Sequence, residues 1–371
     1  MTPFRRFVFV SLALCLALGL SAGARADSGP MYTPTQRFGV GVANQYADIT
    51  HYDVSPLNLG WYMDWGYNAS PARPGGIEYY QLVGTAPAGW PPNWTALGEA
   101  VRANPGSAWL VGNEPDAAPG LMDAQMPDTY ATAYHDVYTF IKAQDATARV
   151  GPGGVIEPTP LRLQYLDMVL ASYQTQYGAA LPADFWATHV QILREQRDDW
   201  GAGIPMGISA DSGRQYYIYE NADPAIFGQL VLEMRTWMAE RGLRNMPLII
   251  SEYGVLMPSL YICYCYDPAV GNAMVIDFMR STFDFLLDAR DATLGYAADE
   301  NRLVQRWSWY SLNEKPYDMP PYGEGYNGPL FDYRNPQYPG VMTVFGQAFR
   351  LYTLHLLETE KRYFPSVTRA Q

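Results

Sequence analysis

The stretch AWLVGNEPD, residues 108–116, joins a short apolar run to a turn that carries an acidic side chain. Four apolar residues in succession are typical of a buried strand, and Pro115 marks the turn that follows. Glu114 therefore lies where the strand ends. A carboxylate is costly to place in an apolar core, so we expect Glu114 to face a cleft.

The stretch PLIISEYG, residues 247–254, has the same form, with an apolar run that ends at Glu252 before a turn. Hydrolysis of a glycosidic bond requires two such carboxylates in one fold, one as proton donor and the other as nucleophile or base. Glu114 and Glu252 are therefore candidates for catalysis.

Eight short apolar or aromatic runs along the chain are strand candidates. They span residues 38–42, 59–64, 77–83, 108–113, 149–153, 185–190, 248–252 and 304–309. Stretches with helical spacing lie among them, at 94–104, 128–144, 160–177, 224–241, 274–287 and 341–357. Strands that alternate with helices predict parallel βαβ units, and eight of them predict one α/β domain, a (β/α)₈ barrel, over residues 27–371.

An open doubly wound sheet is the alternative, but no glycine-rich phosphate loop follows the first strand. In the barrel, Glu114 follows the fourth strand and Glu252 ends the seventh. Barrel enzymes carry their active sites at the carboxyl ends of the strands, so both glutamates are expected on one rim.

Four motifs resemble those of the clan A glycoside hydrolases, and more narrowly family 128, the endo-β-1,3-glucanase group with an Asl1-like catalytic core. They are GWYMDWG (60–66), WLVGNEPD (109–116), DFWATH (184–189) and IISEYG (249–254). The resemblance implies a retaining enzyme with Glu114 as acid and base and Glu252 as nucleophile. It also implies that Asn113 binds the sugar 2-hydroxyl, although a turn-forming Asn is the alternative.

The chain departs from family 128 after His189, where VQ replaces the usual aromatic residues, and in two long loops at 193–224 and 257–267. Loops on the active face shape the substrate cleft. Xylanase, mannanase and β-1,4-glucanase specificities therefore stay open beside β-1,3-glucanase, as does a non-catalytic carbohydrate-binding barrel.

Several other side chains are candidates for substrate binding. His189 either binds a sugar hydroxyl, or orients Glu252, or is a core histidine bonded to a backbone group. Clan A enzymes often place a Trp after the eighth strand, which points to Trp307 or Trp309, and we favour Trp309. The remaining candidates are Tyr253, Trp61 and Trp65, each with core packing as the alternative.

Tyrosine is frequent, with 29 residues, and many lie in expected loops at 216–219 and 261–266. Exposed loop aromatics are typical of a glycan-binding surface, although packing over the barrel would also explain them. Cys263 and Cys265 either form a local disulfide or remain thiols. The four histidines show no metal-ligand spacing, so we expect no metal or organic cofactor.

The N-terminus is typical of a secretory signal, with Arg5 and Arg6, an apolar run at 7–20 and the small-residue site ARA at 24–26. Cleavage there would give a secreted chain beginning at Asp27, whereas an uncleaved anchor is the alternative. That chain would hold 22 basic and 37 acidic residues, a net charge of −15. Such a charge disfavours nucleic acid as a partner, and we expect a soluble monomer that acts on a polysaccharide or oligosaccharide.

Overall fold

A computed structural model describes residues 30–318 and 323–363 of the chain. The predicted signal peptide, residues 1–26, and the predicted start at Asp27 lie outside these residues. None of the helices in the described residues is long and apolar enough to cross a membrane.

The described residues contain nine strands, and every pair of neighbouring strands is parallel. Six of them form one sheet in the order β3-β2-β1-β9-β8-β7, and three form a second in the order β4-β5-β6. Their bounds are β1 (Phe38–Gly41), β2 (Trp61–Met63), β3 (Glu78–Tyr79), β4 (Gln81–Val83), β5 (Ala108–Val111), β6 (Arg149–Pro152), β7 (Trp186–Val190), β8 (Leu248–Tyr253) and β9 (Arg306–Trp309).

The two sheets join into one barrel. The β3 and β4 segments are a single interrupted strand beside β2, since Tyr80 N donates to Tyr62 O at 2.9 Å. On the opposite side, Asp184 N donates to Val150 O at 2.8 Å, which links the start of β7 to β6. The eight predicted strand positions and the predicted (β/α)₈ architecture are confirmed, and the open sheet is excluded.

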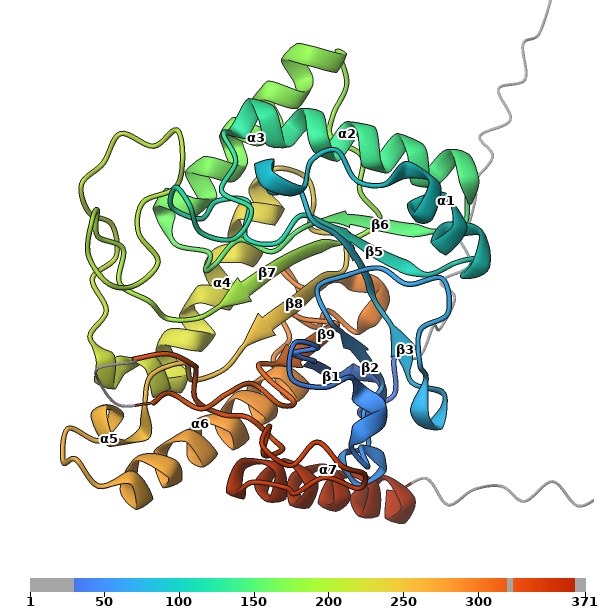
Figure 1. Ribbon diagram of the computed structural model, residues 1–371. Helices are drawn as coiled ribbons and strands as arrows, with labels where there is room; N and C mark the ends of the chain where they lie inside the picture. Colours follow the sequence, from blue (N-terminus) through green and yellow to red (C-terminus); the bar gives the residue numbers. More distant parts are fainter. Residues whose placement is uncertain (1–29, 319–322, 364–371) are drawn as a thin grey trace, which may run out of the picture.

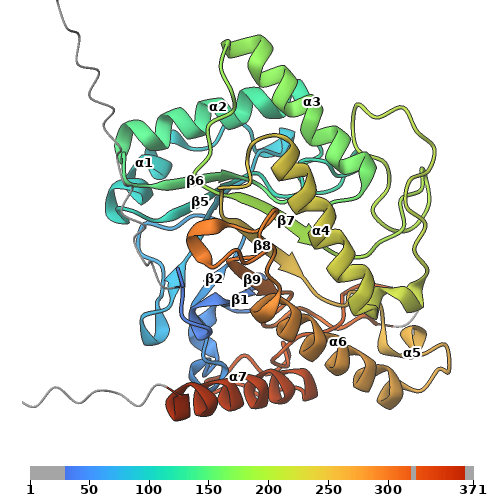
Figure 2. The ribbon, with the colours of Figure 1, turned by 180° about the vertical axis from the view of Figure 1, so that it is seen from behind.

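Helices surround the barrel, as Figures 1 and 2 show from opposite sides. Aspartate side chains cap α4 and α6, where Asp223 accepts from Ala225 N and Asp267 from Ala269 N. The helix bounds are α1 (Trp94–Ala103), α2 (Pro127–Gln144), α3 (Pro160–Tyr177), α4 (Pro224–Glu240), α5 (Ser259–Ile262), α6 (Pro268–Asp288) and α7 (Val344–Tyr363).

The first two strands are followed by short 3₁₀ turns in place of α-helices. The C-terminal helix α7 covers the outer side of this region, and its Phe349 ring lies 5.8 Å from that of Phe38 in β1. The end of the chain therefore supplies cover that the first crossovers lack.

Side chains of the strands alternate between two cores. An inner core fills the barrel with Trp61, Met63, Tyr80, Leu110 and other apolar residues. A larger outer core packs the opposite face of each strand against the helices. The direction of a side chain along a strand therefore decides whether it can reach the interior of the barrel.

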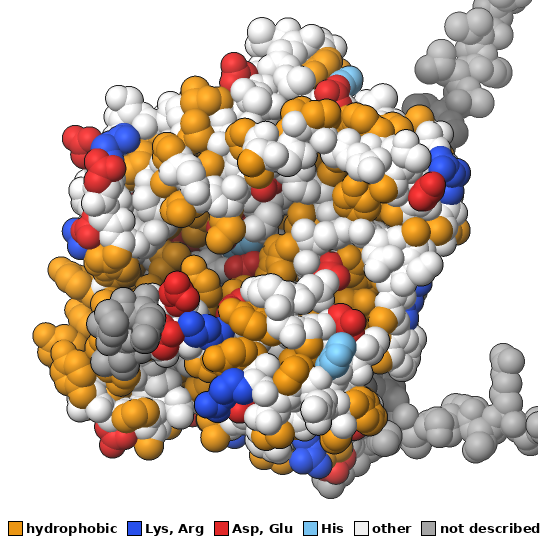
Figure 3. Space-filling view, in the orientation of Figure 1, with side chains coloured by type: hydrophobic (Ala, Val, Ile, Leu, Met, Phe, Trp, Pro, Cys, Tyr) orange, Lys and Arg blue, Asp and Glu red, His pale blue; other side chains and the backbone are white. Residues whose placement is uncertain are grey.

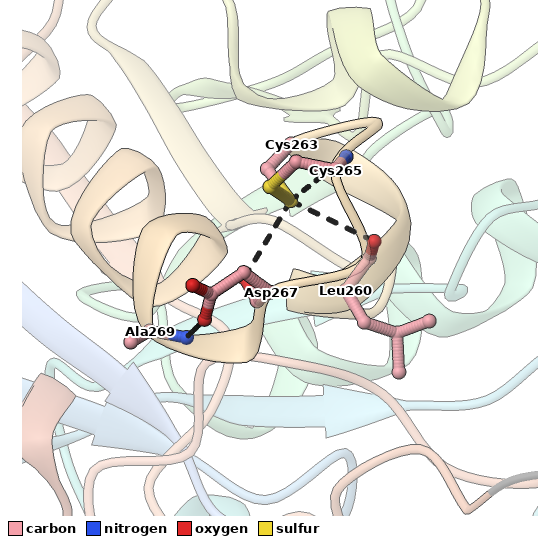
Figure 4. The surroundings of a disulfide bond; sticks show 5 residues. All are labelled: Leu260, Cys263, Cys265, Asp267 and Ala269. Atoms are coloured by element: carbon pink, nitrogen blue, oxygen red, sulfur yellow. Dashed lines mark hydrogen bonds between the residues drawn. A yellow bond between two sulfur atoms is a disulfide. The ribbon is translucent and has the colours of Figure 1, made fainter.

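Cys263 and Cys265 form a disulfide in the segment between α5 and α6, which answers the question that the sequence left open. Figure 4 shows the bond beside Asp267, the residue that caps α6. The disulfide and the helix cap together hold this short loop.

Candidate active site

Glu114 follows β5 in an unusual backbone conformation. Its φ is +49°, in the left-handed region that few residues other than glycine adopt. A hydrogen bond from Glu114 N to Gly154 O, 3.1 Å long, holds the turn in place. Such a conformation costs about 1–3 kcal/mol and is typical of functional sites, where the surrounding structure maintains it.

Asn113 lies beside Glu114, and both residues line a cavity at the carboxyl end of the barrel. Asp123 fixes its backbone, because one carboxylate oxygen accepts from Asn113 N at 2.9 Å and from Thr85 N at 2.6 Å. The side-chain oxygen of Asn113 is buried and has no hydrogen-bond partner. This oxygen can therefore accept a hydrogen bond from a hydroxyl group of a ligand.

Glu252 lies near the end of β8 and is held through both of its carboxylate oxygens. Gln191 Nε2 donates to Oε1 at 2.6 Å, and Trp65 Nε1 donates to Oε2 at 3.1 Å. Both donors are neutral and both side chains line the cavity. They fix the orientation of Glu252 and stabilise its ionised form.

His189, near the end of β7, contacts the other glutamate. Its Nδ1 lies 2.8 Å from Glu114 Oε1, and the ring is buried. The expectation that His189 orients Glu252 is therefore wrong, since its hydrogen bond goes to Glu114. Gly154 leaves room for the ring, because a Cβ at this position would lie 2.5 Å from His189 Cδ2.

The three side chains meet at the carboxyl end of the barrel. One oxygen from each of Glu114 and Glu252 and one ring nitrogen of His189 all lie within 4.8 Å of one another. Glu114 and Glu252 border a cavity of about 460 Å³. Figure 3 shows acidic side chains and a histidine at the bottom of a hollow in this face.

Burial and mutual charge shift the ionisation of this cluster. Burial, and then the charge of Glu114, raise the pKa of Glu252 to about 7, although His189 and the two donors oppose the shift. Burial lowers the pKa of His189, but the charges of Glu252 and Glu114 outweigh it and raise the pKa above its usual value.

The same three residues are also the group that could hold a metal ion among the described residues. Both oxygens of Glu252 already accept hydrogen bonds from N–H donors, and Glu114 is bonded to His189. Three of the four carboxylate oxygens therefore already have a hydrogen-bond partner within the protein.

The prediction for the tryptophans of β9 is wrong. Trp307 and Trp309 are two residues apart and share one face of the strand, which packs outward against the helices. Trp307 lies 4.9 Å from the ring of Phe38, and Trp309 Nε1 donates to Gly328 O at 2.9 Å. Neither is exposed to the cavity.

Two more predicted binding residues also belong to the core. Tyr253 follows Glu252 and points to the opposite face, where its hydroxyl lies 3.4 Å from Thr282 Oγ1 of α6. Trp61 points into the barrel but lies below the cavity, with its ring 4.4 Å from that of Tyr80. Trp65 is the tryptophan that reaches the site.

Two cavity residues, Gln191 and Tyr310, were not predicted from the sequence. Gln191 follows β7 in a loop, so strand alternation does not predict its direction. Tyr310 lies directly after β9 and points opposite to Trp309, which places its ring 5.7 Å from that of Trp65. Inward alternation from Ser308 could have identified Tyr310, which takes the place that we expected Trp309 to fill.

A buried charge cluster supports the loop on one side of the cavity. Arg162 pairs with Asp116, and its Nε lies 3.1 Å from Glu195 Oε1. Two guanidinium bonds also reach the carbonyls of Ala202 and Gly203 in the loop that follows β7. Burial raises the pKa of the nearby Glu157 to about 8.

Comparison with known proteins gives matches at the level of structure. No family model and no curated protein matches the sequence. A glucosidase from Croceicoccus marinus matches with 14% identity and a TM-score of 0.54, covering 88% of this chain and 68% of that chain. A monomeric beta-xylosidase from Caulobacter crescentus CB15 matches with 15% identity and a TM-score of 0.51, covering 88% and 69%.

An oligosaccharide-binding protein of family 128, subgroup VII, from Cryptococcus neoformans matches with 13% identity and a TM-score of 0.50, covering 89% and 99%. At such identities the likeness shows a shared fold. The barrel is thus similar to those of family 128 and of other clan A glycoside hydrolases, the groups whose motifs the sequence resembles.

Proposed function

We propose that this protein is a secreted, retaining glycoside hydrolase that cleaves internal β-linkages of a polysaccharide. The observation that carries the proposal is the pair Glu114 and Glu252, with one oxygen of each within 4.8 Å. Retaining enzymes hold their two carboxyl groups about 5–5.5 Å apart, whereas inverting enzymes leave about 6.5–9.5 Å for a water molecule.

In the first step, a carboxylate oxygen of Glu252 attacks the anomeric carbon. The glycosidic oxygen leaves with the proton of the Glu114 carboxyl, and a covalent glycosyl-enzyme forms. Trp65 and Gln191 direct the attacking carboxylate, since each donates to one of its oxygens.

In the second step, the ionised Glu114 removes a proton from water, and the resulting hydroxide attacks the anomeric carbon. Glu252 leaves as a carboxylate and Glu114 is again protonated, so the configuration of the sugar is retained. His189 stays within 2.8 Å of Glu114 and positions it for both transfers.

Replacement of either glutamate by glutamine tests the proposal. Glu114→Gln and Glu252→Gln should each remove nearly all activity while the far-UV circular dichroism spectrum stays unchanged, because glutamine keeps the shape but neither donates a carboxyl proton nor attacks. A panel of β-1,3-glucan, β-1,4-glucan, xylan and mannan identifies the substrate, with β-1,3-glucan first because of the family resemblance. Wild-type-like turnover in either variant would sink the proposal.

A non-catalytic role in oligosaccharide binding is the second candidate. The structural match from Cryptococcus neoformans is described as an oligosaccharide-binding protein, which motivates this alternative. Binding of glycans in the panel without any turnover by the wild-type protein would favour it.

A further inference from the structure

Four tyrosines form an exposed ridge beside the cavity. We define the tyrosine ridge as Tyr217, Tyr219, Tyr264 and Tyr266, whose side chains are 62%, 46%, 79% and 71% exposed. The first two lie at the 3₁₀ turn Ile218–Ala222 before α4, and the other two lie between α5 and α6. In Figure 3, hydrophobic side chains gather at the edge of the molecule where Figure 1 places α5.

Three of the four rings, those of Tyr217, Tyr219 and Tyr264, contact one another in a defined arrangement. Tyr217 and Tyr219 are parallel, with centroids 5.4 Å apart and an angle of 5° between their planes. Tyr264 meets Tyr219 edge-on at 6.2 Å, which joins the two segments of the ridge. An aromatic surface this exposed is costly in water unless it has a partner.

The loop that carries Tyr264 and Tyr266 is held in shape. The disulfide joins Cys263 to Cys265 across Tyr264, and Tyr266 precedes the Asp267 cap of α6 (Figure 4). Rigid aromatic side chains lose little conformational entropy when they bind, so the ridge is preorganised for contact.

Asn221 ties the ridge to the catalytic pair. Its side chain accepts from Met257 N at 3.1 Å and donates to Gln191 O at 2.6 Å. Met257 lines the cavity, and Gln191 holds Glu252. Both segments of the ridge therefore have a fixed position relative to the cavity, next to the loop that follows β8.

We propose that the tyrosine ridge is a second carbohydrate site, which binds a neutral β-linked polysaccharide outside the catalytic cavity. Aromatic faces fit the C–H faces of pyranose rings, and the phenol hydroxyls can bond to sugar hydroxyls. The charged neighbours in sequence are Glu220 and Asp267, so the ridge disfavours an anionic polymer. The proposal deepens the proposed function, since the ridge would hold the polymer whose bonds the cavity cleaves.

Binding to insoluble polysaccharide tests the ridge without relying on turnover. The background is the double variant Glu114→Gln/Glu252→Gln, and the probes are particles of β-1,3-glucan, cellulose and insoluble xylan. Adding Tyr264→Ala/Tyr266→Ala should raise the apparent Kd for the bound polymer about tenfold, a loss of about 1.4 kcal/mol of binding free energy. Tyr338→Ala is the matched control, because Tyr338 is also 68% exposed but lies outside the ridge.

A second assay distinguishes a defect in the ridge from a defect in the cavity. Tyr264→Ala/Tyr266→Ala is made in the protein with Glu114 and Glu252 intact, and hydrolysis of a short aryl glycoside is measured. The ridge variant should keep the wild-type kcat/KM on this substrate, while its activity on the insoluble polymer falls with the loss of binding. If the protein binds the polymer through the ridge but cleaves no glycan, the second carbohydrate site is supported and the proposed hydrolase activity is contradicted.

The inference would be overturned if Tyr264→Ala/Tyr266→Ala had the same Kd for the polymer as the control Tyr338→Ala, or if the protein bound none of the three polymers. It would also be overturned if sedimentation velocity showed a dimer that the ridge substitutions abolish.

Discussion

Gln191→Met is the sharpest test of how the site controls Glu252. Methionine keeps the length of the side chain but removes the Nε2 donor that lies 2.6 Å from Glu252 Oε1. The donor lowers the pKa of Glu252 because it stabilises the ionised form. Its loss should therefore raise the pKa of the nucleophile and narrow the range of pH in which the enzyme is active.

The size of the effect follows from the burial of the pair. A hydrogen bond to a buried charged group contributes about 1.5–3 kcal/mol. One pKa unit corresponds to about 1.4 kcal/mol, so the acidic limb of the pH–rate profile should move upward by about one to two pH units. Activity at neutral pH therefore falls, and it approaches that of the wild type only above the raised pKa of Glu252.

Two assays check this result. The pH dependence of kcat/KM is measured on the cleaved glycan, and ¹³C NMR of labelled glutamate follows Glu252 in the free protein. Gln45→Met is the matched control, because Gln45 lines the cavity and bonds to Glu314 rather than to the catalytic pair. An acidic limb at the wild-type position in a folded Gln191→Met protein would refute the reasoning.

Three further predictions concern the protons and the packing around the site. Because burial raises the pKa of Glu252 to about 7, the ionised nucleophile is lost as the pH falls through this value, and kcat/KM should decline below about pH 7; a plateau down to pH 5 would contradict it. Gly154→Ala should lower kcat/KM at least tenfold and reduce the free energy of unfolding by about 1–3 kcal/mol, since the new Cβ displaces His189. Gly89→Ala, where a Cβ meets open space, should change neither quantity. Burial raises the pKa of Glu157 from 4.5 to about 8, so the folded protein keeps a proton that the unfolded chain releases near pH 4.5. The free energy of unfolding should therefore fall as the pH rises from about 4.5 to about 8. In urea unfolding at pH 5–8, Glu157→Gln should remove about 1.4 kcal/mol per pH unit of this slope, and an unchanged slope would contradict the assignment.

The barrel and its acidic pair could be predicted because both depend on local pattern. Buried parallel strands are continuous apolar runs, and Glu114 and Glu252 stand out where such runs end. The partners of these residues depend on distant contacts. Gln191 reaches Glu252 from a loop in which Ile192 has a φ of +53°, and no apolar pattern predicts that turn.

Errors among the aromatic residues have a different cause. Because Glu252 points inward, strand alternation alone places Tyr253 outward, and this inference was available from the sequence. Trp307 and Trp309 are two residues apart and share one face of β9, so alternation cannot choose between them, and Tyr310 on the opposite face was overlooked. Trp61 does point inward, but its depth in the barrel depends on strand tilt, which the sequence does not encode locally.

The covering of β1 by the last helices has a consequence for biosynthesis. Phe38 in the first strand packs against Phe283 of α6 at 4.9 Å and Phe349 of α7 at 5.8 Å. A ribosome that adds roughly 5–20 residues per second makes Phe349 about 15–60 s after Phe38. In the nascent chain β1 thus remains without this part of its cover until α6 and α7 have been made.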